Sequence, residues 1–385
     1  MPLDIAKANP NEVLRNFIEG VRGLKDGVKV VLGYDIESIL TAGMIIKALR
    51  GQDTPFEVIN AVEASRNLYE VNNVVSINAD LVTCKGCINL QTSESDSAIR
   101  RASSYILRYR LLADSVRQVL SEYVIMPKEL RYLIMASLIS KHTPRLLSGE
   151  LSEVERDFVN KLVSEGLLDV VRAPQLIGWV YATPAEAAKY SVDIMVPDFF
   201  MSEEVPSDLD VSHIVKALGV DRKVIEGPHY LIKPRWFVKD IHLLSYILTW
   251  AIDVEGPEVL PLAVLNTNHL IWYGIGYMRS LGLLRSLVDT VRRGSHKKIG
   301  RMLIIDIDAI ESFSLTVASK ALRGSKLISS NDLVLGKVGD DVYIPVQAVT
   351  KKLLMGLLKH DADLHRGYIV IKASRLANVI KYAGV

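Results

Sequence analysis

The sequence predicts an α/β protein built from two α/β domains. Short runs rich in Val, Ile and Leu alternate with segments of helical apolar spacing, and this order is typical of a parallel sheet covered by helices. A chain of 385 residues is long enough to form two such domains. A polar, glycine-bearing and basic stretch at residues 292–301 separates two regions of this kind, so we predict a linker there.

The larger first domain is predicted over residues 1–291. Apolar spacing indicates a helix over residues 11–24, capped by Asn9 or Asn11, and a helix over residues 37–50 that follows a turn at Tyr34–Asp35. The predicted strands of this domain are residues 28–33, 56–61, 74–78, 88–90 and 167–172. The spacing then favours a helical insert, with helices over residues 96–123, 128–141, 151–166, 238–252 and 268–292.

The smaller C-terminal domain is predicted over residues 302–385. Its expected strands are residues 302–307, 333–338, 342–346 and 368–372, with helices over residues 316–323 and at the end of the chain. Turn-rich segments at residues 197–206 and 227–234 are expected to mark subdomain edges of the larger domain.

Composition narrows the class of protein. The formal charge of +2 neither requires nor excludes a nucleic-acid partner. Two cysteines are too few for a disulfide scaffold. No apolar run reaches the roughly 18 residues that span a bilayer, and the N-terminus lacks the pattern of a signal peptide. We therefore expect a cytoplasmic protein without a membrane partner.

The turn after the first predicted strand carries two acids. The segment Tyr34–Leu49 reads YDIESILTAGMIIKAL, with Asp35 and Glu37 near its start. It resembles the first motif of the DHH phosphoesterases, the family of the RecJ nucleases, which runs roughly IDADGITSAAILAKAL. In that family both acids are metal ligands, together with a histidine two residues before the first acid. Here Gly33 stands at the histidine position, and Ser38 replaces a glycine.

Further segments resemble the same family in the same order, from Tyr34 to His360. They are Tyr132–Lys141, Glu165–Arg172, Leu176–Trp179, Phe237–Ala251 with Gly256–Val259, and Thr316–Ser319. The resemblance implies an N-terminal DHH-like domain and a C-terminal accessory domain of the DHHA1 type. The family's glycine-rich G-G-G-H loop would align near Leu357–His360, where bulky residues replace the glycines.

The ligands of the family's metals are largely missing. The Asp-His-His triplet is absent, the first histidine of the chain is His142, and Lys141 stands where the family has a metal-binding aspartate. The stretch Cys87–Glu94, where the triplet would fall, offers polar neutral groups and Glu94. Two acids are too few to hold two divalent ions, so we expect no metal and no cofactor. Lys141 either pairs with Asp35 or Glu37 in place of the metal charge, or lies in solvent while Asp35 caps the following helix.

Three other features of the sequence bear on function. The CxxC of Cys84 and Cys87 is a redox couple, a disulfide or a pair of thiols at a strand edge. Trp236, Trp250 and Trp272 have apolar neighbours and are predicted to be core residues. The linker carries a basic cluster that is either solvated or in contact with nucleic-acid phosphates. The residues of this basic cluster are Arg292, Arg293, Lys297, Lys298 and Arg301.

Loss of the ligands with retention of the two-domain body resembles the nuclease-inactive branch of the family. That branch includes the eukaryotic cell-division-cycle forty-five replication factor and archaeal counterparts. The resemblance implies a non-catalytic scaffold at the replication fork, with the GINS complex and the MCM helicase as partners and single-stranded DNA as a further ligand. The alternative is an active manganese-dependent single-strand exonuclease of the RecJ type, with a rearranged site.

Overall fold

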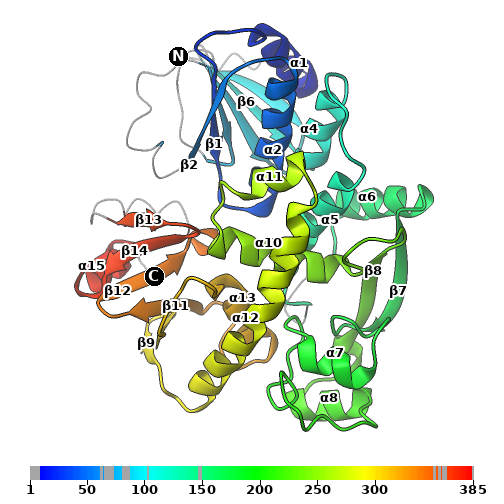
Figure 1. The fold of residues 1–385 in the computed structure, drawn as a ribbon, viewed down its shortest axis with the longest axis vertical. Coiled ribbons are helices and arrows are strands. Elements are labelled where there is room, and N and C mark those ends of the chain that lie inside the picture. Colours follow the sequence, from blue (N-terminus) through cyan, green and yellow to red (C-terminus); the bar gives the residue numbers. More distant parts are fainter. Residues whose placement is uncertain are drawn as a thin grey trace. The chain divides into compact units, whose positions relative to one another are not determined.

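The structure is a computed structural model that describes residues 9–60, 64, 73–79, 87–101, 104–145, 150–349, 353, 357 and 362–383. The chain folds into two compact units, residues 1–137 with 257–270 and residues 138–256 with 271–385 (Figure 1). The domain boundaries expected at residues 291 and 302 stay a prediction.

The first unit is built on a six-stranded sheet of order β2-β1-β3-β4-β6-β5. All neighbouring strands run parallel except β5, which is antiparallel to β6. The strands are β1 (Val28–Leu32), β2 (Phe56–Asn60), β3 (Val74–Ile77), β4 (Ile88–Thr92), β5 (Ser97–Arg101) and β6 (Ser104–Tyr109). The predicted N-terminal parallel sheet is thereby confirmed.

The first two helices of the first unit begin at side-chain caps. α1 (Pro10–Gly20) has Asn9 as its N-cap, as predicted, and α2 (Ile36–Gly51) has Asp35. The other helices are α4 (Leu112–Leu120), α5 (Leu130–Ser140), whose last three residues belong to the second unit, and α11 (Leu260–Leu265). α2 is buried along most of its length, since α4 and α11 both pack against it.

The helix predicted over residues 96–123 is wrong. Residues 97–101 and 104–109 form the antiparallel strands β5 and β6, and the helical residues of this segment are 112–120. Ile106, Leu107 and Tyr109 of β6 are buried, and β6 pairs with β4 along five residues. This long-range pairing stabilises a strand that the local apolar spacing does not indicate.

The second unit contains a mixed six-stranded sheet of order β13-β14-β12-β11-β10-β9. Its strands are β9 (Lys297–Ile299), β10 (Met302–Asp306), β11 (Leu333–Val338), β12 (Asp341–Pro345), β13 (Asp363–His365) and β14 (Tyr368–Lys372). The predicted C-terminal α/β domain is confirmed in its strands and in α13 (Leu315–Gly324) and α15 (Ala373–Ala383). Part of the predicted linker, residues 297–299, is the edge strand β9.

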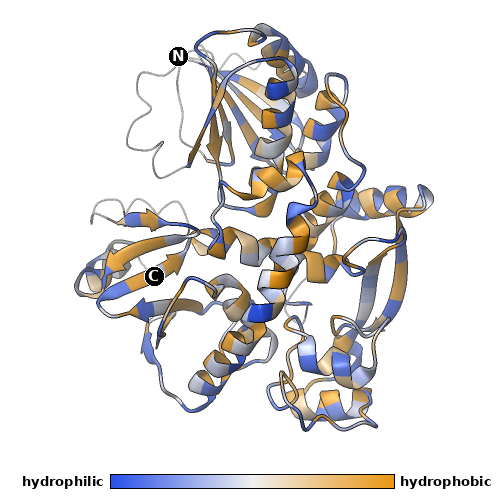
Figure 2. Ribbon diagram, viewed as in Figure 1, coloured by the Kyte–Doolittle hydropathy of each residue, from blue (hydrophilic) through white to orange (hydrophobic). Residues whose placement is uncertain are grey.

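The rest of the second unit is mainly helical. β7 (Leu168–Pro174) and β8 (Glu226–Ile232) form a separate two-stranded antiparallel sheet, so the turn expected over residues 227–234 is mostly strand. The helices are α6 (Glu153–Ser164), α7 (Pro184–Tyr190), α8 (Val211–Leu218), α9 (Arg222–Ile225), α10 (Ile241–Val254) and α12 (His269–Arg292). Apolar residues gather along the strands and helices of both units (Figure 2). None of the helices in the described ranges has the length and apolar character needed to cross a membrane.

Candidate degenerate metal site

The candidate site lies where three neighbouring parallel strands end. Gly33 and Asp35 follow β1, Asn78 follows β3, and Thr92 is the last residue of β4. The carboxyl ends of parallel strands form the usual ligand-binding edge of an α/β sheet. The structure therefore brings the predicted Gly33, Asp35 and Glu37 together at an edge where ligands commonly bind.

Asp35 is held by the helix that it caps. One carboxylate oxygen accepts a hydrogen bond from the Ser38 backbone N–H at 3.0 Å, and the other accepts one from the Ser38 hydroxyl. Asn78 Nδ2 donates to that same hydroxyl at 2.9 Å. Ser38 stands where the family motif has glycine, and its side chain occupies one oxygen of the acid that would bind a metal.

Glu37 is buried, with only 1% of its surface exposed. Its Oε2 accepts a hydrogen bond from the Thr92 hydroxyl at 3.1 Å, and its Oε1 accepts one from the Ala113 backbone N–H at 3.3 Å. Ala113 lies in the first turn of α4, where free N–H groups and the helix dipole favour a negative charge. The carboxylate thus has protein donors on both oxygens.

Asn78 joins the two acids into one network, which the sequence analysis did not find. Its Nδ2 also donates to Thr92 Oγ1 at 3.1 Å, and its Oδ1 accepts from the Thr92 backbone N–H at 2.9 Å. Asn78 has a φ of 48°, a left-handed conformation that asparagine adopts more readily than most residues. An asparagine directly after a buried strand was the signal that could have identified it.

Gly33 leaves little room for the histidine of the family motif. A Cβ atom at this residue would lie 2.7 Å from the carbonyl oxygen of Ile77 and 2.9 Å from Ser38 Oγ. Contacts this short require the neighbours to move. The serine at residue 38 and the missing histidine at residue 33 are therefore linked, because the two side chains would compete for one space.

The donor set does not fit two divalent ions. Each would need several carboxylate or imidazole ligands, whereas this edge supplies two carboxylates with hydrogen-bonded oxygens, a neutral amide and two hydroxyls. Within the described ranges no group of three or more His, Cys, Asp and Glu residues could hold a metal ion.

Three predicted features stay predictions in whole or in part. Lys141 follows the end of α5 and is exposed, and the structure does not test its pairing with Asp35 or Glu37. Cys84 lies outside the described residues, whereas Cys87 is disulfide-bonded and is not a free thiol. The G-G-G-H alignment falls mostly outside the described residues too, because only Leu357 of Leu357–His360 is described.

The Thr316–Ser319 match lies at the start of α13 and has a structural role. The Thr316 backbone N–H and hydroxyl donate to the buried carboxylate of Asp253 at 2.9 and 3.0 Å, and Ser314 and Gln347 donate at 2.8 and 2.7 Å. Burial raises the pKa of Asp253 to about 6, although these hydrogen bonds oppose the shift. The motif therefore anchors α13 to α10.

The basic cluster is spread over a helix end and an edge strand. Arg292 ends α12 and pairs with Asp198 at 2.8 Å, and Lys298 pairs with Asp332 at 2.7 Å. Arg293, Lys297 and Arg301 are exposed and form no ion pair within the described ranges. Lys297 and Lys298 are successive residues of β9 and so point to opposite faces.

The expectation that Trp236, Trp250 and Trp272 are core residues is wrong for Trp272. Trp250 is 4% exposed and belongs to the core, as predicted, and Trp236 is partly buried. Trp272 is 71% exposed, because it lies on the outward face of α12. Its apolar sequence neighbours do not indicate burial, since several of them are exposed as well.

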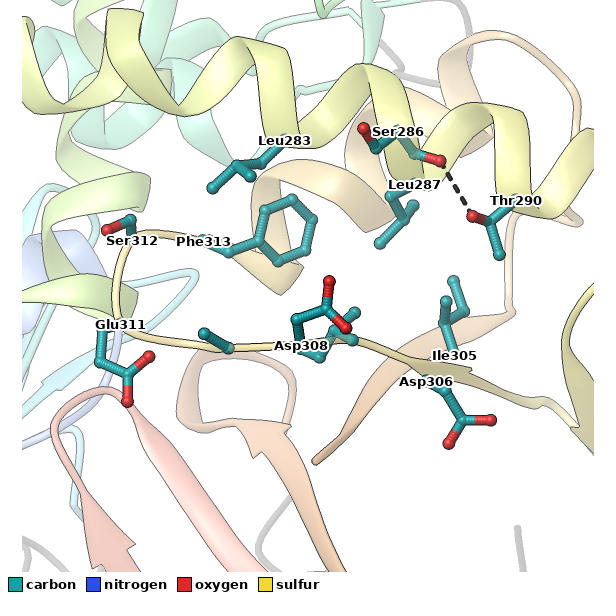
Figure 3. Close-up of a pocket in the computed structure, with 12 residues that line it drawn as sticks. Leu283, Ser286, Leu287, Thr290, Ile305, Asp306, Asp308, Glu311, Ser312 and Phe313 are labelled. Atoms are coloured by element: carbon teal, nitrogen blue, oxygen red, sulfur yellow. Dashed lines mark hydrogen bonds between the residues drawn. The ribbon is translucent and has the colours of Figure 1, made fainter. Parts of the chain in front are cut away.

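A pocket in the second unit carries three further acids. It lies between α12 and the loop after β10, and its apolar lining includes Leu287 and Phe313 (Figure 3). The figure shows Asp308 pointing into the pocket, whereas Asp306 and Glu311 point away from it. These three carboxylates do not converge on one point, so they do not form a metal site.

Comparisons with known proteins bear on the fold. No protein-family model matches the chain, and no curated protein is similar to it in sequence. Among solved structures, CDC45 from Entamoeba histolytica has a TM-score of 0.60 and 10% identity, with 97% of each chain covered. RecJ from Thermus thermophilus in complex with Mn²⁺ has a TM-score of 0.45 and 11% identity, covering 100% of this chain and 56% of that chain.

A structure of exonuclease RecJ bound to manganese gives a TM-score of 0.41 at 11% identity, over 100% of this chain and 95% of that chain. The CDC45 match extends over nearly the whole of both chains, which confirms the fold expected from the order of the sequence motifs. The chain therefore has the fold of CDC45.

Proposed function

We propose that this protein is a non-catalytic DNA replication factor that bridges the GINS complex and the MCM helicase. One observation carries the non-catalytic part: the oxygens of Asp35 and Glu37 are engaged by protein donors where metal ions would otherwise bind. The fold of CDC45 supports the replication role, and the resemblance of the sequence motifs to the inactive branch of the family supplies the partners.

The chemical reason is the charge balance of the site. Two divalent ions carry four positive charges, and the network offers two carboxylates and no imidazole within the described residues. Displacing Ser38, Thr92 and the α4 N-terminus from these carboxylates would leave polar groups unpaired, at a cost of about 1 to 3 kcal/mol each. In this proposal the surface of the fold carries the function.

Association with purified partners tests the scaffold role. GINS and MCM from the same host should each bind the full chain, and GINS should retain more MCM when the chain is present. Size-exclusion chromatography with light scattering measures both effects. If neither complex binds the purified protein, the bridging role is wrong.

The second part of the proposal is that the exposed residues of the basic cluster contact single-stranded DNA. Arg293, Lys297 and Arg301 are exposed and lack ion-pair partners among the described residues, so their charges are available to phosphates. The salt dependence of this binding is considered in the Discussion.

An active manganese-dependent exonuclease is the alternative function. Asp35 and Glu37 favour it, because both acids of the first family motif are retained at the correct edge of the sheet. Degradation of 5′- and 3′-labelled single strands in manganese buffer decides the question. Activity that disappears in Asp35→Ala would establish the nuclease and overturn the non-catalytic proposal.

A further inference from the structure

Helix α12 exposes a continuous apolar stripe. Ile271, Trp272, Ile275 and Met278 are 44%, 71%, 39% and 46% exposed. Residues three and four positions apart lie on one face of a helix, so these side chains form one strip along two turns. Single exposed apolar residues are ordinary on protein surfaces, but a contiguous group marks a contact surface.

The opposite face of the same helix is packed. Tyr277 and Leu281 are buried, and Gly276 lies so close to Trp250 of α10 that an added Cβ would approach its ring to 2.2 Å. Burial on this side fixes the rotation of α12. The exposed stripe is therefore a fixed feature of the fold and does not depend on a rotation of the helix.

Three residues of the stripe form one wall of an apolar groove, and Trp272 lies beside them on the exposed side of the helix. Phe237, Val238, Leu243 and Ile247 line the groove together with Ile271, Ile275 and Met278. Gly274 lies between the two walls, and an added Cβ there would come within 3.4 Å of Phe237. A groove with two apolar walls resembles the surfaces that bind an amphipathic helix.

The charges around the groove are positive. Arg279 lines it, and Arg235 and Lys239 flank the lining residues Phe237 and Val238 in the chain. All three cations are exposed and form no ion pair within the described ranges, and no acidic residue lines the groove. An occupant that matches this surface has an apolar face with acidic residues beside it.

We propose that this groove, named here the α12 groove, binds an acidic amphipathic helix of a partner protein. Trp272 and Arg279 supply the residue types that most often dominate binding energy at protein interfaces. The proposal concerns a surface distant in sequence from Asp35 and Glu37, and it holds whether the chain is a scaffold or a nuclease.

Two designed helical peptides of equal hydrophobicity test the proposal. Both carry leucines along one face, and the flanking residues are glutamates in one peptide and lysines in the other. Fluorescence anisotropy with the full chain should show saturable binding of the glutamate peptide, weakened by added salt, and no binding of the lysine peptide. Equal binding of the two peptides, or no binding of the glutamate peptide, would overturn the proposal.

Variants locate the binding surface. Trp272→Ala and Met278→Ser should each weaken binding of the glutamate peptide about tenfold or more. Arg279→Glu should weaken it too and allow the lysine peptide to bind. Leu283→Ser is the matched control, since Leu283 is a 48% exposed residue of the same helix outside the groove, and it should leave the affinity unchanged. All four residues are exposed, so thermal melting should show that the variants fold.

Two measurements on the protein alone exclude other occupants. Acrylamide should quench the emission of Trp272, obtained as the difference from Trp272→Phe. Protection of Trp272 in the dilute protein would show that the chain covers its own groove and would overturn the proposal. Concentration-dependent dimerisation that Trp272→Ala abolishes would identify a second copy as the occupant, with the same consequence.

Discussion

Asp35 and Ser38 form a capping pair at the start of α2. The cap directs both carboxylate oxygens toward the backbone and hydroxyl of Ser38. In the family motif that Tyr34–Leu49 resembles, the corresponding acid is a metal ligand, whereas Asp35 has a structural task as the cap of α2. The retained acid by itself is therefore weak evidence for catalysis.

Asp35→Ala should lower the free energy of unfolding by about 1 kcal/mol, because an N-cap and its hydrogen bonds are lost. Asp35→Asn should cost less, since asparagine also caps helices well. Thermal melting of both variants measures the difference. Manganese should leave the melting temperature of the parent protein unchanged, and a rise that requires Asp35 would show that the site does bind metal.

The pair of Glu155 and His142 predicts how stability depends on pH. Burial alone would raise the pKa of Glu155, but hydrogen bonds from His142 and from Ser152 together lower it to about 2. A lowered pKa in the folded state contributes stability above the ordinary value near 4.5, and this contribution is lost as the pH falls toward 2. The contribution is at most about 3 kcal/mol.

Glu155→Gln should therefore flatten the decline of stability between pH 4.5 and pH 2. Glutamine can still form the capping box with Ser152, so the helix start should persist. Urea unfolding across this pH range is the measurement. Glu153→Gln, an exposed position in the same helix turn, is the control and should keep the slope of the parent protein. An unchanged slope in Glu155→Gln would contradict the assignment.

At the scale of elements, the close approach of α2 and α11 depends on one glycine. A Cβ added at Gly43 would lie 2.7 Å from Val264 Cγ2 and 3.1 Å from Pro261 Cα. The short α11 is therefore held near the axis of α2, at a distance that a side chain would prevent.

Gly43→Ala should destabilise the protein by about 1 to 3 kcal/mol through overpacking, even though alanine favours helices. Gly282→Ala in α12 is the matched control, because no atom lies within 4 Å of its added Cβ. That control should raise stability by up to about 1 kcal/mol through helix propensity alone. Denaturant unfolding compares the two, and equal effects would contradict the packing argument.

The elements differ in how well the sequence predicts them. β1, β3 and β11 are short segments rich in Val, Leu and Ile, and α2 follows an acid that can cap a helix, so these elements were predicted closely. β6 was missed because it owes its conformation to pairing with β4, which joins residues far apart in the chain. The two acids of the site were predicted from the sequence. Asn78 and Thr92 were not, because their position beside these acids depends on which strands are neighbours in the sheet.

The net charge of +2 is the small difference between many positive and negative residues, which can still gather in local groups. The basic cluster lies at the end of α12 and on β9, and two of its five members are already in ion pairs. Cations on an edge strand also oppose pairing with another chain, so β9 has a structural use for them.

If three free cations contact single-stranded DNA, the logarithm of the binding constant should fall with the logarithm of salt concentration with a slope of about −2. Engagement of all five would give about −3.5. Replacing Arg293, Lys297 and Arg301 together with glutamine should bring the slope near zero, whereas Arg292→Gln should change it little. Fluorescence polarisation at several salt concentrations measures the slope, and a parent slope near zero would exclude this DNA contact.

A side chain at residue 33 and the Ser38 side chain would occupy the same space, and this limits which substitutions the site can accept. A histidine introduced at residue 33 meets the serine and the Ile77 carbonyl, and a glycine introduced at residue 38 removes a partner of Asp35 and Asn78. Each single substitution toward the ligand set of the family motif would therefore remove contacts of the site before any metal ligand is complete. Metal binding at this edge of the sheet would require several simultaneous substitutions.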